Sequence, residues 1–333
     1  MAAGLAYRFT RPESRLHILD QPNHRSLHDL PVPRSGGVAV LLAILMGVAG
    51  ISILWSLPFS LLGMLLGLLA VSVVGFIDDM GGVRPRYRLL VQVGAALCLV
   101  VSGLRADVLN FPGGSWVMWS GVAVVVSCLF VVWMVNLYNF MDGMDGLAGC
   151  MALIGFGTLA LFGWLQGHVV FTLLNSVVAM SALGFLVLNF PPAKLFLGDV
   201  GAYGFGFLSA GMLLWGDQLG IVPLWIGLLI FSPFIADATS TLLIRLIRGK
   251  RVWEAHREHA YQHAVQSGLG HRSTLILSIG IMLSVSVSAL LLREAAEGVQ
   301  WLLISIWLVF YLAVFWYARK SRYNQSDMSG GLG

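Results

Sequence analysis

The sequence contains very few charged residues and very few cysteines. Only 11% of its 333 residues are charged, whereas 58% are hydrophobic, and the mean hydropathy is +0.83. A soluble protein could not bury so much apolar surface, so this composition excludes the soluble classes. The three cysteines, Cys98, Cys128 and Cys150, lack the spacing of a metal site or a disulfide framework.

Two further absences narrow the class of membrane protein. No segment of useful length alternates apolar and polar residues, as the strands of a membrane β-barrel do. Residues 1–35 are polar, basic and rich in proline, and they contain no apolar run typical of a signal peptide. We therefore expect the spans to be helices and membrane insertion to depend on the first of them.

Ten apolar stretches are each near the length that a helix needs to cross a bilayer. They comprise residues 36–57, 58–77, 88–104, 116–135, 146–165, 168–189, 200–216, 221–247, 274–292 and 299–318. The sequence predicts an all-α polytopic membrane protein with one transmembrane domain at 36–318. A cytoplasmic N-terminal segment at 1–35 and a cytoplasmic tail at 319–333 flank this domain.

The positive charges lie almost entirely on one side of the predicted bundle. Of the 20 Lys and Arg residues, only Arg105 and Arg293 fall on the other side. The positive-inside rule assigns the basic side to the cytoplasm. The net charge of +4 then reflects topology and affinity for anionic lipid headgroups, and nothing in the sequence suggests nucleic-acid binding.

The most informative stretch on this side reads N-L-Y-N-F-M-D-G-M-D-G-L-A from residue 136 onward. Its polar residues, Asn136, Asn139, Asp142 and Asp145, recur every third position, and its glycines favour an oxygen-lined turn. Carboxylates beside hydrocarbon usually have a partner or a task. Oxygen ligands without histidine or cysteine suit Mg²⁺ better than zinc. Alternatively, Asp145 only caps the following helix.

Two more acidic motifs lie at the ends of apolar spans on the same side. Asp78 and Asp79 end the second span and precede a glycine turn and three arginines. At most one of the pair is expected to face a ligand directly, and the alternative is a turn paired with those arginines. Asp199 begins the seventh span and is either a ligand or an N-cap. Lys194 nearby could hold a phosphate as a point charge.

The remaining polar segments each have two interpretations. The segment that begins at Asp20 is either a surface loop at the headgroups or part of an anion site completed by Arg25 and Arg34. A proline and Asp237 inside the eighth span indicate a break that lines a polar cavity, or else a lone kink. The basic loop after this span binds either headgroups or, through Arg257 and its histidines, a diphosphate.

Together these motifs resemble those of the polyprenyl-phosphate N-acetylhexosamine-1-phosphate transferases (glycosyltransferase family 4). The similarity runs in order from about Asp20 to His263. It rests on D-Q-P-N followed by P-R-S-G-G, the D-D pair, the stretch from Asn136, F-L-G-D-V-G, P-F-I-A-D and the basic histidine loop. Each motif alone is weakly specific, but together, in register on one face, they are highly specific. The chain looks closest to the branch that initiates O-antigen or other surface glycans.

Two departures from the family pattern stand out. Family members usually have another membrane helix before the segment that matches Asp20, whereas only residues 1–19, which are polar, precede it here. Either this protein dispenses with that helix or the start of the sequence is wrongly assigned. Of the family's histidine motif, often H-x-H-H, only His259 is kept, because Tyr261 and Gln262 follow it. This argues against the peptidoglycan enzyme, which carries three consecutive histidines.

The resemblance implies a catalytic transmembrane domain whose active site lies on the cytoplasmic face of the bacterial inner membrane. The implied reaction transfers a HexNAc-type sugar 1-phosphate from a UDP-sugar to undecaprenyl (polyprenyl) phosphate and releases UMP. The implied cofactor is Mg²⁺, with Mn²⁺ as a substitute. Membrane lipids are the other partners, and a homodimer is left open.

The resemblance also implies roles for particular residues. The residues expected to take part in catalysis are Asp78, Asp79, Asp142 and His259. The residues expected to contact the substrates are Asn136, Asp145, Lys194, Arg257 and Arg25. The residues expected to bind the metal are Asp199 and Asn139, with Asp142 as the alternative second ligand. One member of the acid pair could remove the last proton of the acceptor phosphate, and the histidine would hold the diphosphate.

The chemistry of this reaction fits the residues independently. Both substrates are anionic, so a divalent cation held by converging carboxylates, together with basic side chains, must offset their repulsion. No residue stands out as an activated nucleophile, which favours direct displacement. An ion-coupled transporter is the alternative, since it would also have intramembrane acids and a broken helix. Acids confined to one face and the lack of a visible inverted repeat argue against it.

Overall fold

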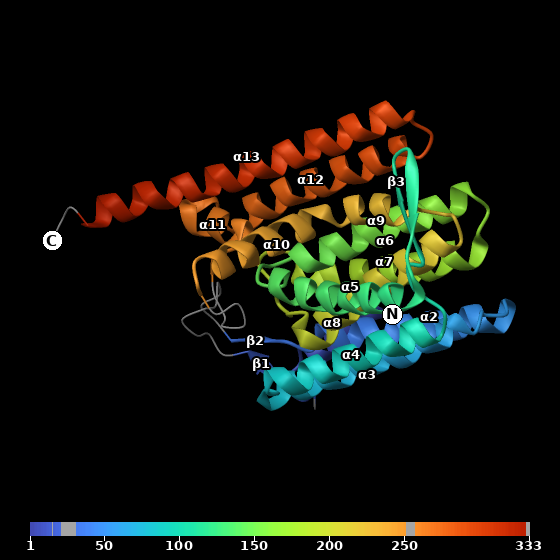
Figure 1. Ribbon diagram of the computed structural model, residues 1–333. Helices are drawn as coiled ribbons and strands as arrows, with labels where there is room; N and C mark the ends of the chain where they lie inside the picture. Colours follow the sequence, from blue (N-terminus) through green and yellow to red (C-terminus); the bar gives the residue numbers. More distant parts are fainter. Residues whose placement is uncertain (15, 21–30, 251–256, 331–333) are drawn as a thin grey trace.

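The structure is a computed structural model that describes residues 1–14, 16–20, 31–250 and 257–330. These residues form a bundle of helices that lie side by side (Figure 1). In chain order the elements are α1 (Ala2–Phe9), β1 (Leu19–Asp20), β2 (Val32–Pro33), α2 (Gly36–Leu54), α3 (Ser60–Gly81), α4 (Pro85–Val101), β3 (Val108–Phe111), β4 (Gly114–Val117), α5 (Ser120–Met141), α6 (Leu147–Leu165), α7 (Val169–Asn189), α8 (Gly198–Gln218), α9 (Leu224–Ile230), α10 (Ser232–Ile247), α11 (Ala260–Ala264), the π-helical turn η1 (Val265–Leu269), α12 (Gly270–Leu292) and α13 (Glu297–Gly330).

The helices confirm the predicted class of all-α polytopic membrane protein. Among the described residues, seven helices are long and apolar enough to cross a membrane, or eight if the bent pair α9–α10 forms one span. The ten predicted stretches coincide with these helices and with α4 and α8. Helix α4 has only 17 residues and carries two arginines in its first turn, and α8 is rich in glycine. The number ten therefore stays a prediction.

Helix α8 lies at the centre of the bundle, where it packs against α2, α3, α5, α6 and α9. Every residue from Val200 to Gly216 is buried by protein, so α8 presents little surface to lipid and does not need a high hydropathy. A cluster of buried aromatic rings joins it to α5, α6 and the α9–α10 bend. This cluster consists of Tyr138, Phe156, Phe205, Phe231 and Phe234.

Two glycines let α2 and α3 approach the N-terminal end of α8 very closely. A Cβ atom on Gly75 of α3 would lie 2.7 Å from the backbone carbonyl carbon of Asp199. A Cβ atom on Gly37 of α2 would overlap the backbone of Gly201. A larger residue at either position would push the helices apart. The close approach therefore holds the last turn of α3 beside the first turn of α8.

The chain bends by 82° between α9 and α10, which confirms the break predicted in the eighth span. Pro233 lies in the first turn of α10, where its missing N–H leaves no hydrogen bond unmade. The bend brings the C-terminal part of this span against α5 and α12. It also places Asp237 close to residues 257–264, here named the histidine loop, which follow α10 in the chain.

The strands form two short antiparallel pairs outside the bundle. Leu19 pairs with Pro33 in β1–β2, and Val108 pairs with Val117 in β3–β4. Figure 1 shows β1, β2 and α11 at one end of the bundle and β3 at the other. The segment after β2 carries Arg34, which contacts the last turn of α3. The candidate site therefore lies at the end of the bundle marked by β1, β2 and α11.

Candidate active site

Three helix ends meet here and bring together carboxylates from distant parts of the chain. Asp78 and Asp79 lie in the last turn of α3, Asp142 directly follows α5, and Asp199 lies in the first turn of α8. The Asp199 carboxyl group interacts electrostatically with those of Asp78 and Asp79, and that of Asp142 with those of Asp79 and Asp199. The four residues, here named the carboxylate cluster, thus lie together as expected, and their roles in the reaction stay predictions.

Asp79 caps the N-terminus of α8 from a neighbouring helix. Its Oδ1 accepts the backbone N–H of Asp199 at 3.1 Å, and its Oδ2 accepts that of Val200 at 3.3 Å. The Arg34 Nε lies 3.8 Å from the same Oδ1, and its guanidinium also donates to the backbone carbonyl of Asp79. The free N–H groups at a helix start favour an anion. Asp79 therefore holds Asp199 in place, whatever part it takes in the chemistry.

Asp78 is held by partners from α4, from α8 and from the turn between α3 and α4. Its Oδ2 lies 2.7 Å from the Arg88 Nη1 of α4 and accepts the Tyr203 hydroxyl of α8 at 3.2 Å. Its Oδ1 accepts the backbone N–H of Val83 at 2.6 Å. The alternative in which the acid pair binds a downstream arginine is thus realised for Asp78. The Asp78 carboxyl group also interacts electrostatically with that of Asp199, so it still belongs to the cluster.

Asn139 of α5 orients the Asp199 carboxylate. Its Nδ2 donates to Asp199 Oδ1 at 2.6 Å, so only its carbonyl oxygen could face a cation. Asp199 does not cap its own helix, because the N-cap position is Leu197 and the first N–H groups are bound by Asp79. The alternative in which Asp199 is only an N-cap is therefore wrong. Its carboxylate faces the other acids instead.

The cluster contains more negative charge than its basic neighbours offset. Burial, together with the carboxylates of Asp199, Asp79 and Asp145, raises the pKa of Asp142 well above its usual value. Among the described residues, no lysine or arginine forms an ion pair with Asp142 or Asp199. Two neighbouring carboxylates without a cation are costly in a partly buried site. A bound divalent cation would relieve this cost.

The residues fit a Mg²⁺ ion that is held in part by its substrate. No three carboxylate, imidazole or thiol groups in the described part of the chain surround one point closely enough to form a complete metal site. Mg²⁺ commonly takes one or two protein carboxylates and completes its shell with water and substrate phosphates. Asp199 and Asp142, with the carbonyl oxygen of Asn139, are the groups that could present such an ion to a phosphate.

Two of the expected substrate contacts take part in structural hydrogen bonds. The Asn136 Nδ2 donates to the Gln92 Oε1 of α4 at 2.7 Å. Asp145 accepts the backbone N–H of Ala193 at 3.0 Å, and the His271 Nδ1 lies 3.6 Å from its other oxygen. No side chain caps α6, so the alternative in which Asp145 caps that helix is wrong. Asp145 instead holds the loop before α8 against the loop after α5.

The basic residues expected to contact the substrates differ in how exposed they are. Lys194 is exposed in the loop before α8, where an anion could reach its ammonium group. Arg257 is partly buried shortly before α11. Arg25 lies outside the described residues. Within the described part of the chain, Arg34 and Arg88 are the arginines that form ion pairs with the carboxylate cluster.

The predicted histidine is held by the acid inside α10. The Asp237 Oδ1 lies 3.3 Å from the His259 Nδ1 and accepts the N–H of Ala260 at 2.9 Å. Its Oδ2 accepts the N–H of Tyr261 at 3.2 Å. Both Asp237 and His259 are buried. We therefore assign Asp237 to anchoring the histidine loop, where the sequence had suggested a cavity-lining residue.

Tyr261 connects the histidine loop to the carboxylate cluster. Its hydroxyl donates to the backbone carbonyl of Phe140 at 3.1 Å, two residues before Asp142. A side chain at Gly143 would overlap this hydroxyl. The His259 ring stacks on Phe140 and on Tyr261, with centroid distances of 6.3 and 5.8 Å. The histidine loop therefore packs directly on the turn that carries Asp142.

The sequence patterns gave no role to three residues that the structure places at the site. Tyr203 follows Asp199 by four positions, and this spacing, which puts both residues on one face of a helix, could have revealed it. Arg88 was visible only as one of three arginines after the acid pair. Tyr261 had been noted only for the histidine that it replaces, and a pattern of residue types does not show a hydrogen bond to another helix.

The chain is similar in sequence to several known proteins. Residues 61–217 match the model of the family described as Glycosyl transferase family 4. The chain is 29% identical over 304 residues to the probable undecaprenyl-phosphate N-acetylglucosaminyl 1-phosphate transferase of Bacillus subtilis (strain 168). This alignment covers 90% of this chain and 83% of that protein. It is 30% identical over 311 residues to the decaprenyl-phosphate N-acetylglucosaminephosphotransferase of Mycobacterium tuberculosis (strain H37Rv). This second alignment covers 83% of this chain and 77% of that protein.

A third relative is the undecaprenyl-phosphate alpha-N-acetylglucosaminyl 1-phosphate transferase of Yersinia pestis, which is 27% identical over 315 residues and covers 90% of this chain and 83% of that protein. The alignments extend well beyond the cluster and include most of the bundle. They agree with the resemblance that the motifs had indicated. The chain therefore belongs to glycosyl transferase family 4, the polyprenyl-phosphate N-acetylhexosamine-1-phosphate transferases.

Proposed function

We propose that the protein transfers a HexNAc-type sugar 1-phosphate from a UDP-sugar to a polyprenyl phosphate, such as undecaprenyl phosphate, and releases UMP. Its relatives are named as N-acetylglucosaminyl 1-phosphate transferases for undecaprenyl or decaprenyl phosphate, which supports sugar-phosphate transfer to a polyprenyl phosphate. The observation that carries the proposal is the meeting of Asp142 and Asp199, without an ion-pair partner among the described residues, at one end of a membrane bundle.

The geometry suits a reaction between two anions. A phosphate oxygen of the acceptor forms a bond to the sugar-linked phosphorus. The bond from this phosphorus to the oxygen that bridges the two phosphates of the UDP-sugar breaks, and UMP leaves with that oxygen. Two unit charges 4 Å apart interact by about 4 kcal/mol at an effective dielectric constant near 20, so positioning and charge neutralisation supply most of the catalysis. Mg²⁺ or Mn²⁺ held by Asp199 and Asp142 would neutralise negative charge on the substrate phosphates. Asp79 and Asn139 would keep Asp199 in one orientation throughout.

The other side chains would divide between the two substrates. The arginines that bind Asp78 and Asp79 reduce the negative charge where an acceptor phosphate would approach. This phosphate is largely ionised at neutral pH, since its second pKa is about 6, and either aspartate would take up its last proton. His259, Arg257 and Lys194 would contact the diphosphate of the nucleotide sugar. The family membership disfavours the ion-coupled transporter.

We further propose a setting for this reaction. The basic ends of the helices support a multi-pass protein of the bacterial inner membrane with the cluster on the cytoplasmic face. There the enzyme would initiate O-antigen or a related surface glycan. A homodimer is compatible with this role.

Incubating membranes that contain the protein with undecaprenyl phosphate and a panel of UDP-sugars tests the function. We expect one UDP-HexNAc to yield a lipid-linked sugar diphosphate, identified by mass, with one UMP released for each product. Uptake of a solute into vesicles driven by a proton gradient, with no UMP formed from any UDP-sugar, would replace the enzyme by a carrier.

Removing divalent metal is expected to stop transfer. EDTA should lower the initial rate by about a hundredfold or more, because even one lost electrostatic contact to a transition state costs that much. Excess Mg²⁺ or Mn²⁺ should restore the rate, as followed by UMP release. A purified enzyme that keeps its full rate in EDTA would show that the carboxylate cluster does not act through a metal ion.

A further inference from the structure

Helices α2 and α3 follow each other in the chain but scarcely touch. Residues 55–59 join them, and helices with so short a connection usually pack together. Here α2 packs on α7 and α8, whereas α3 packs on α4 and α8. The two helices therefore stand apart over a floor formed by α7 and α8.

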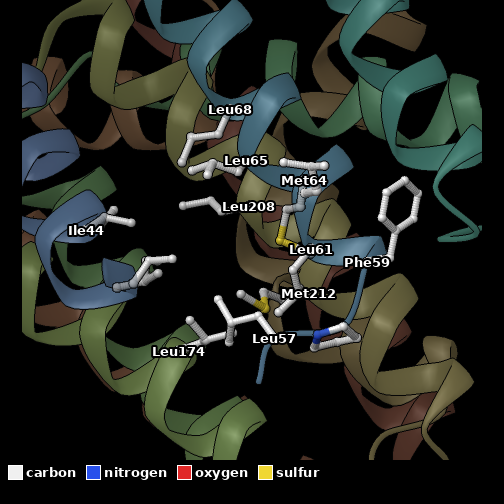
Figure 2. A pocket seen from close by; sticks show the side chains of 14 residues that line it. Ile44, Leu57, Phe59, Leu61, Met64, Leu65, Leu68, Leu174, Leu208 and Met212 are labelled. Carbon is white, nitrogen blue, oxygen red and sulfur yellow. The ribbon is translucent and has the colours of Figure 1, made fainter. Parts of the chain in front are cut away.

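A cavity of about 330 Å³ fills this gap (Figure 2). All of its lining residues are apolar, and Figure 2 shows Ile44 of α2, Leu61 of α3 and Met212 of α8 around a common space. The rim is open, because Phe59 exposes 76% of its surface and Leu62 exposes 47%. In a membrane this opening faces lipid tails, so the cavity suits a hydrocarbon chain that enters from the side.

A second cavity of only about 10 Å³ lies between this space and the carboxylate cluster. It shares Leu68 with the larger cavity and reaches Val200 and Gly201, next to Asp199. Along α3, Leu68 precedes Asp79 by a helical distance of about 16 Å at 1.5 Å per residue. The apolar gap thus begins beneath the cluster as a constriction and widens farther into the bundle.

We propose that this gap holds part of the polyprenyl chain of the acceptor, and this inference rests on the function proposed above. An acceptor whose phosphate reacts at the cluster must pass its chain into the bilayer. The gap between α2 and α3 begins at Val200 and Gly201, is lined by apolar side chains apart from Ser72, and opens to the lipid. The acyl chain of a bilayer phospholipid could enter the wide part, but it would gain nothing from the continuation toward the cluster.

The expected contribution to affinity is moderate. Lipid tails are as apolar as the cavity wall, so the hydrophobic effect does not drive a chain from the bilayer into the gap. The chain gains only the better packing of its atoms against fixed side chains. Occupancy should therefore appear in the KM for long acceptors and leave kcat unchanged.

Filling the cavity tests the inference. Val48 of α2 lines the cavity, whereas Met46 of the same helix exposes 55% of its surface to the outside. We expect Val48→Trp to raise the KM for undecaprenyl phosphate by about five- to tenfold, the effect of a lost contact worth roughly 1 kcal/mol or slightly more. The KM for a two-isoprene phosphate, which ends above the cavity, and the KM for the UDP-sugar should not change. Met46→Trp should change none of them.

A second variant narrows the constriction without disturbing the fold, and a matched control leaves the constriction unchanged. A Cβ atom on Gly204 would lie 3.6 Å from Leu68 Cδ1, which is an ordinary contact, and one on Gly50 would meet nothing within 4 Å. Gly204→Ala should therefore raise the KM for both acceptors, because even the short chain passes the constriction, and Gly50→Ala should raise neither. Val48→Trp and Gly204→Ala enzymes whose KM values for both acceptors match those of their control variants would overturn the inference and leave the proposed function standing. A wild-type enzyme that uses neither acceptor would instead overturn the function.

Photo-crosslinking identifies the occupant directly in the wild-type protein. Undecaprenyl phosphate that carries a diazirine near the end of its chain should label peptides of α2 and α3 that line the cavity, and excess unlabelled undecaprenyl phosphate should prevent the labelling. A diazirine phosphatidylglycerol that labels the same peptides, and that excess undecaprenyl phosphate does not displace, would assign the cavity to bilayer lipid and overturn the inference.

Discussion

Asp199→Asn is expected to lower the rate of sugar-phosphate transfer about a thousandfold, the upper range for one lost electrostatic contact to a transition state. The change keeps the size of the side chain but removes the charge of a carboxylate that has no ion-pair partner among the described residues and that Asn139 orients. The backbone N–H of residue 199 would still bind Asp79, so the fold should persist. Initial rates of UMP release from purified enzyme at saturating Mg²⁺ measure the effect.

The matched control for this variant is Asp217→Asn at the other end of the same helix. The Asp217 carboxylate accepts the backbone N–H of Leu224 at 2.8 Å and the Asn110 amide at 3.5 Å, and an asparagine oxygen can keep the first bond. We expect near wild-type rates there. An Asp199→Asn enzyme as fast as Asp217→Asn would remove Asp199 from the metal and from the chemistry.

Asp237→Asn is expected to lower kcat/KM for the nucleotide sugar about a hundredfold. The present carboxylate accepts bonds from Ala260, Tyr261 and His259, and an amide would turn an NH₂ group toward at least one of these donors. Each buried donor left unpaired costs about 1–3 kcal/mol, so the histidine loop should detach from α10. Because this loop carries the expected diphosphate contacts, the KM for the UDP-sugar should rise more than that for the acceptor.

Two comparisons separate this positioning role from general loss of structure. Thr241→Val removes only the hydroxyl that donates to the same carboxylate at 3.2 Å and should have a small effect on both KM values. Hydrogen exchange should report opening of the segment from residue 257 to 264 in Asp237→Asn, with the rest of the bundle as protected as in the wild type. Equal rises in the KM for both substrates would contradict the assignment.

The sequence alone determined the class of protein, the helices and the end of the bundle that carries the polar motifs. These follow from local quantities. Apolar runs of a given length must be helices in a bilayer, because no water is present there to bind the backbone. The charge distribution suggests an orientation, and motifs at span ends identified the family through Asp78, Asp142 and Asp199. The predicted break beside Pro233 had the same local origin.

Only the tertiary structure decided what each acid contacts. Asp79 caps a helix that begins 119 positions later, as its bond to the Asp199 N–H shows; Asp78 pairs with Arg88; and Asp237 holds the histidine loop. The gap between α2 and α3 was equally invisible, since residues 36–77 read as two ordinary spans. The physical reason is that partners across helices depend on how closely the backbones approach, and that distance is set by packing around α8, which no local pattern of residue types records.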